Sequence, residues 1–160
     1  AAARSGDDAA QDAATRVLGG WLSPDAAPVL LDLAKAGPEK FRIRCLRGFI
    51  RIPRQFDVSL QGRIAMCRDA MAAATRDAEK ALVLEVLGRN PSPETLAEVA
   101  PYLDDEALHA AASAAAVAIA EKLIDQHPGP VAEVLQEAVE AEDEEVAGKA
   151  RRLLRRAKNK

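Results

Sequence analysis

The residues of this chain best suited to chemistry are arginines spaced three and four positions apart. At 100° per residue they share one flank of a helix, within about 80° of one another: Arg44, Arg47, Arg51 and Arg54. A guanidinium group keeps its charge and donates paired hydrogen bonds to carboxylates or phosphates. This arginine stripe is our candidate binding site, for an acidic protein surface or a nucleic-acid backbone. The alternative interpretation is a solvated helix face balanced by neighbouring acids.

The sequence offers no comparable arrangement for catalysis. His109 and His127 stand 18 residues apart, with no cysteine or histidine at ligand spacing. There is no Ser-His-Asp, Cys-His or HExxH pattern, and no glycine-rich phosphate loop. We therefore expect a protein that is not an enzyme, with no cofactor and no metal. Cys45 and Cys67 lie among apolar residues, which predicts buried free thiols; a disulfide would need Cα atoms within about 7 Å.

Charge is distributed in blocks although the net formal charge is only −3. Residues 40–68 contain eight basic residues against one acid, and residues 77–145 contain seventeen acids against three basic residues. The acidic run 140–145 is predicted to be a solvated turn before a last, basic helix. The acidic second half and the pI of 5.5 argue against nucleic acid. No apolar run reaches the ~18 residues of a membrane span, so we expect no membrane insertion.

The elements that must position the stripe are predicted to be helices throughout. Alanine supplies 35 of the 160 residues, aromatic residues only 3%, and period-two apolar runs are missing. The stripe lies on a helix expected to start at Pro38 and to continue to Ile52, before Pro53. Its opposite face is apolar, so we expect Arg47 and Arg51 to face solvent.

The other helices are bounded by the same punctuation. Ser23 and Ser92 each precede a proline and should cap a helix. His127 begins a His-Pro-Gly-Pro sequence that predicts a break. Trp21, in a turn, is expected to cover the edge of the core. The remaining predicted helices are 9–19, 24–36, 58–74, 77–88, 93–101, 105–126, 131–141 and 145–157.

An internal repeat organises these helices. The segment VLGGWLSPDAAPVLLDLA at 17–34 overlays without gaps on VLGRNPSPETLAEVAPYL at 86–103, an offset of 69 residues. One further helix pair lies between the copies, so the period is near 35 residues, typical of a solenoid.

These motifs resemble HEAT repeats, in particular the short bacterial repeats of phycobilin-lyase-type proteins. The resemblance rests on Leu18-Gly19, Ser23-Pro24-Asp25, the apolar run 28–33 and the helix around 41–49, and it covers about residues 10–157. It implies an all-α, right-handed α-α superhelix of about four helix pairs. In such proteins the second helix of each pair lines the concave surface, where the arginine stripe would then lie. Most proteins of this kind are not catalytic.

The sequence thus predicts a non-catalytic interaction or scaffold module whose partner has an acidic surface or belongs to other domains of its parent protein. The alternatives are nucleic-acid binding by the Arg-rich helix 40–54, a structural spacer in a larger enzyme, and a bilin-lyase-like enzyme whose pigment contacts are not recognisable. We expect one repeat domain over 1–160, part of a longer protein, with a disordered leader at 1–8 and tail at 158–160. The compartment, cytoplasmic or periplasmic, stays open.

Overall fold

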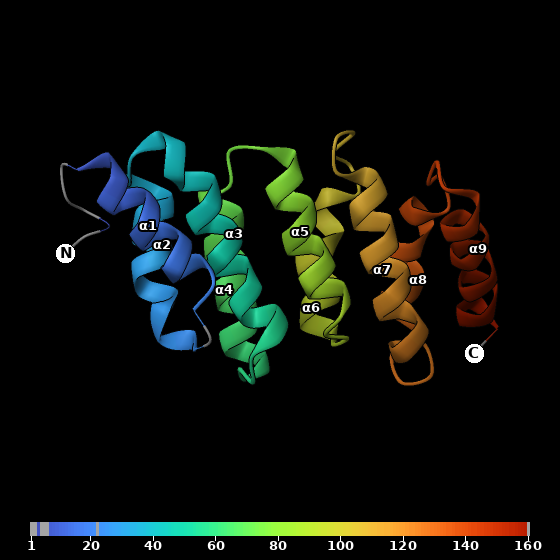
Figure 1. Cartoon of the computed structure of the whole chain (residues 1–160). Coiled ribbons are helices and arrows are strands. Elements are labelled where there is room, and N and C mark those ends of the chain that lie inside the picture. The colour runs from blue at the N-terminus through green and yellow to red at the C-terminus, as the bar shows by residue number, and fades with distance from the viewer. Residues whose placement is uncertain (1–2, 4–6, 22, 160) are drawn as a thin grey trace. The chain divides into compact units, whose positions relative to one another are not determined.

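The computed structural model describes residues 3, 7–21 and 23–159, and this part of the chain is helical without a strand (Figure 1). It contains nine α-helices, α1 to α9, which confirms the predicted all-α class. The chain divides into two compact units, Ala1–Glu79 and Lys80–Lys160, each described here by itself. The expectation of a single domain over 1–160 stays a prediction.

The first unit is built around its longest helix, α3 (Glu39–Gln55), which packs against α1, α2 and α4. These helices are α1 (Asp8–Gly19), α2 (Ala27–Ala36), preceded by the 3-10 turn Pro24–Ala26, and α4 (Leu60–Ala73). The predicted apolar face of α3 is buried. The unit ends within the first turn of α5 (Asp77–Gly88).

The second unit contains the rest of α5 and is built around α7 (His109–Leu123), which packs against α6, α8 and α9. These are α6 (Pro93–Val99), continued by the 3-10 turn Ala100–Tyr102, α8 (Pro128–Ala138) and α9 (Glu144–Lys158). Alanines form much of the buried face of α7, and their small side chains allow close helix contacts. Lys158 is thus helical, whereas the predicted tail began there; residues 1–2, 4–6 and 160 of the predicted leader and tail lie outside the described residues.

The two predicted Ser-Pro starts are confirmed. Ser23 accepts the backbone N–H of Asp25, and Ser92 forms a capping box with Thr95. In both places proline occupies the first turn, where its missing N–H has no helical acceptor to lose.

The prediction that the stripe helix ends before Pro53 is wrong. Proline removes the bond to the carbonyl of Phe49 and disfavours a helical conformation at Ile52. Both Ile52 and Pro53 are nevertheless buried, and Phe56 still donates to Ile52 O at 3.0 Å. Packing of the buried face therefore carries α3 on to Gln55.

Two further boundaries differ from the predictions. The predicted break 127–130 is limited to His127, because Pro128 and Pro130 lie in the first turn of α8. The helix predicted from residue 105 begins only at His109, since Asp105 accepts the Ala107 N–H and holds a separate turn.

The bounds of the helices repeat at the offset seen in the sequence. Moving α1 by 69 residues reproduces the bounds of α5, and moving α3 gives 108–124, close to α7. The same shift takes α4 to 129–142, over α8, and α5 to 146–157, inside α9. The repeat is therefore present in the succession of helices and not only in a short sequence overlay.

Candidate interaction groove

The candidate site lies in the first unit, where α1 runs beside α3. Asp7 starts α1 by accepting the Ala9 N–H at 2.9 Å, a normal N-cap. The residues that α1 buries most are polar, Gln11 and Thr15. A helix that buries polar groups needs hydrogen-bond partners opposite, and the basic residues of α3 supply them.

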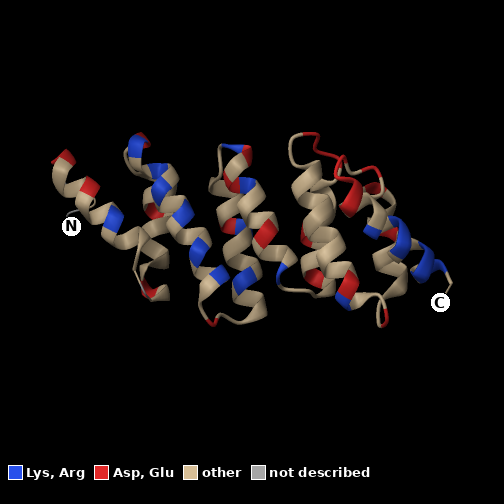
Figure 2. Ribbon diagram, turned by 45° about the vertical axis from the view of Figure 1, so that its right-hand side comes forward, with Lys and Arg blue, Asp and Glu red and all other residues tan. Residues whose placement is uncertain are grey.

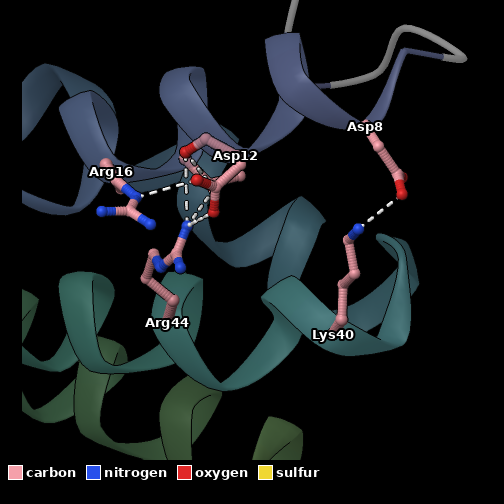
Figure 3. Close-up of polar contacts among 6 residues, drawn as sticks. Asp8, Asp12, Arg16, Lys40 and Arg44 are labelled. Carbon is pink, nitrogen blue, oxygen red and sulfur yellow. Dashed lines mark hydrogen bonds and ion pairs between the residues drawn. The ribbon is translucent and has the colours of Figure 1, made fainter.

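Two ion pairs join α1 to α3 (Figure 3). Lys40 Nζ lies 2.6 Å from Asp8 Oδ2, and Arg44 Nη1 lies 2.7 Å from Asp12 Oδ1. The same Nη1 donates to Thr15 Oγ1 at 2.9 Å. Each helix contributes residues four apart, so the pairs follow one another along the interface at one turn of helix.

Asp12 is shared between two arginines. Arg16 Nε lies 2.9 Å from Oδ2, while Arg44 holds Oδ1. The hydrogen bond from Arg44, followed by the charge of Arg16, lowers the pKa of Asp12 against a smaller opposing effect of burial. The carboxylate therefore stays ionised in more acidic solution than an ordinary aspartate.

At the other end of α1 the two helix backbones come close together. A Cβ on Gly48 would lie 2.9 Å from Gly19 Cα and 3.3 Å from a methyl of Leu30. No side chain fits there without moving α1. The glycine pair thus sets the separation of α1 and α3.

A groove of about 620 Å³ opens along this helix pair. Its lining consists of five cations with two glycines and an isoleucine: Arg16, Lys40, Arg44, Arg47, Arg51, Gly19, Gly48 and Ile43. We call it the cationic groove. The carboxylates of Asp8, Asp12 and Glu79 pair with four of these cations, so five positive charges face three negative ones, an excess of two. Such a surface attracts anionic groups.

Arg47 has a structural partner as well as a place in the groove. Its Nη2 lies 2.8 Å from Oε1 of Glu79, whose side chain is only 1% exposed. Arg76 Nε binds the other oxygen of Glu79 at 3.1 Å. A buried carboxylate needs such compensation, because an unpaired one costs several kcal/mol. Arg47 itself remains 52% exposed, as predicted.

Arg51 differs from the prediction and from its neighbours. It is half-buried, not solvent-facing, because its Nη2 turns back to donate to the backbone carbonyl of Trp21. Its Nε is buried without a hydrogen-bond partner. Within the described residues Arg51 has no carboxylate partner, so its charge contributes to the excess in the groove.

The structure therefore brings together three of the four stripe residues, Arg44, Arg47 and Arg51, in one groove, whereas Arg54 is exposed and does not line it. Sequence reasoning missed Arg16, and with it Asp8 and Asp12. Their spacing of four matches that of Lys40 and Arg44, a signal that becomes visible only when α1 is known to pack on α3.

Trp21 lies next to the groove through its backbone, which Arg51 binds. Its side chain is 47% exposed, so the prediction that it covers the edge of the core is wrong. Val17, one turn earlier, is 57% exposed. An aromatic and an aliphatic side chain thus border the cationic residues.

Other candidate centres are modest. Cys45 and Cys67 are buried free thiols, as predicted, and burial raises the pKa of Cys45. His109 Nδ1 lies 2.6 Å from Leu103 O, a satisfied position near the helix start. Within the described ranges, no group of three or more His, Cys, Asp or Glu could hold a metal ion, and no helix is long and apolar enough to cross a membrane.

Comparison of the chain with protein-family models, with curated proteins and with solved structures found no match. The resemblance to HEAT repeats therefore stays a prediction from the motifs.

Proposed function

We propose that this chain is a non-catalytic interaction module built as a HEAT-like α-solenoid, and that its cationic groove captures an acidic protein segment. The repetition of the helix bounds at 69 residues supports the solenoid, since a solenoid stacks helix pairs of constant length. The observation that carries the binding function is the groove itself, with five cations in its lining and no acid among the lining residues.

The size and charge of the groove favour a short acidic segment over a nucleic acid. An excess of two charges offers little counterion release to a polyanion, whose affinity depends on many phosphate contacts. The carboxylates of Asp8 and Asp12 also lie beside the lining cations and would repel a continuous phosphate backbone. A peptide carboxylate needs only one arginine fork, and an arginine that holds one carboxylate with some donors retains others.

The test is a titration of the chain with hexaglutamate, followed by calorimetry and by the fluorescence of Trp21, the only tryptophan. We expect saturable binding that weakens with added salt, because the contacts are charged. Arg51→Glu should weaken binding by about tenfold or more, since it places a like charge in the groove. Arg16→Glu, an exposed position, provides a second groove variant if the first folds poorly.

The matched control is Arg152→Glu, the same charge change at an exposed position of α9. If this variant loses as much affinity as the groove variants, the binding is not in the groove and the proposal fails. Tighter binding of a single-stranded oligonucleotide than of hexaglutamate would instead favour a nucleic-acid ligand.

A further inference from the structure

The second unit carries a surface of opposite charge to the groove. Six acids, all exposed, lie at the end of α8, in the following turn and at the start of α9: Glu137, Glu140, Glu142, Asp143, Glu144 and Glu145. We call residues 137–145 the acidic loop. In Figure 2 the acidic residues gather in this turn, whereas lysines and arginines follow α3 in the first unit.

The acidic loop is held in a defined shape by its own backbone. Glu140 N–H donates to Glu137 O at 3.2 Å, and Ala141, which is buried, donates to Ala138 O. Asp143 Oδ1 accepts the N–H groups of Glu145 and Val146 and caps α9. A loop fixed in this way loses little conformational entropy when a partner binds it.

Part of the charge on this loop is already compensated. Glu145 pairs with Lys149 at 2.7 Å and Glu144 with Arg151 at 3.5 Å, both within the second unit. Glu137, Glu140 and Glu142 are exposed and have no ion-pair partner within the part of the chain that the structure describes. These three carboxylates are the groups on the loop that a cationic partner can still engage.

We propose that the acidic segment bound by the cationic groove is the acidic loop of a second copy of this chain. This inference rests on the proposed function and names its partner. The groove has uncompensated positive charge around Arg51, and the loop has uncompensated negative charge around Glu140 and Glu142. Opposite potentials on two surfaces steer association and fix its orientation.

The contact joins different surfaces of the two copies and is therefore heterologous. Each bound copy keeps one unfilled groove or one unbound loop, so further copies can add to a chain of molecules unless a ring closes. Charged contacts at the surface are screened within about 8 Å at physiological ionic strength. Self-association should therefore rise with protein concentration and fall with salt.

Sedimentation velocity of the full chain over a wide concentration range, at low and at moderate salt, tests the inference. Two variants are needed, Arg51→Glu in the groove and Glu140→Lys/Glu142→Lys in the loop. Each variant alone should lose self-association by about tenfold or more, because its only complementary pair of surfaces is gone. Mixed together they should form a one-to-one dimer, because the loop of the first fits the groove of the second and the other ends repel.

The control is Glu106→Lys/Glu133→Lys, which changes the net charge equally at two exposed acids outside the loop. It should associate like the wild type. A chain that stays monomeric at all concentrations while binding hexaglutamate would overturn the second-copy inference and leave the proposed function intact. Loss of both would overturn both, and equal dimerisation of the control and wild type with no dimer in the variant mixture would place the contact elsewhere.

Discussion

The central helices of the two units, α3 and α7, occupy matching places in the repeat and differ in almost every polar residue. At the offset of 69, the four stripe arginines correspond to four residues of the second unit that are all buried: Ser113, Ala116, Ala120 and Leu123. Along α1, Asp12 corresponds to Ala81 and the buried Thr15 to the buried Leu84. One copy of the repeat thus has a charged helix pair with a groove, and the other has an apolar pair.

The comparison separates what the repeat needs from what this unit adds. Helix bounds, Ser-Pro starts and the glycine that ends the first helix recur in both units. A Cβ on Gly88 would lie 3.0 Å from Ala115 Cα, so the second unit also has a close approach at this glycine. Since small apolar residues suffice to build α7, the cations of α3 are not required by the architecture. Features of a repeat that its scaffold does not need are candidates for function.

The largest expected effect comes from giving α3 the alanine that α7 has at the position of Arg47. Arg47→Ala leaves the buried carboxylate of Glu79 with Arg76 alone, and we expect a loss of about 3 kcal/mol in the free energy of unfolding. Urea denaturation measures it. Lys40→Ala is the control, since its pair with Asp8 is exposed on both sides and should contribute about 0–1 kcal/mol. Equal losses for the two variants would mean that Glu79 is not held by Arg47.

A smaller loss should follow from Gly48→Ala, which tests the close approach of α1 and α3. The new Cβ would meet Gly19 Cα, and such overpacking costs about 1–3 kcal/mol. Thermal unfolding compares it with Gly129→Ala, where no atom lies within 4 Å and the lower backbone entropy of the unfolded chain should make the change neutral or slightly stabilising. If Gly48→Ala were as stable as wild type, the groove would have room to widen.

The smallest effect concerns Asp12, which the second unit replaces by alanine. Its pKa is lowered in the folded chain, so its contribution to stability is present above the ordinary pKa of an aspartate, about 3.9, and is lost as the pH falls through the lowered value. Wild type and Asp12→Asn should therefore differ in melting temperature at neutral pH and converge in acid. A difference that persists below pH ~2 would assign the effect to something other than ionisation.

Local signals in the sequence were enough for the helical class and for most helix starts. Ser23 and Ser92 announce their caps through side chains that bond to the nearby backbone, and the periodicity of α3 alone places three arginines on one flank. Pro53 shows where local rules fail, because burial against other helices outweighs a missing hydrogen bond. The groove could be predicted only by half: Arg16 and Glu79 reach it from helices whose pairing with α3 is a tertiary property.

The two ion pairs between α1 and α3 have a consequence for sliding. If α1 moved by one helical turn, about 5.4 Å, so that Asp12 met Lys40, Arg16 would come opposite Arg44 and the two like charges would repel. A turn in the other direction would leave Asp12 facing the backbone of Gly48, with no cation to bind. Only one register satisfies both carboxylates. The pairs thus act as a position lock for α1, and the shape of the groove is fixed by electrostatics before any ligand arrives.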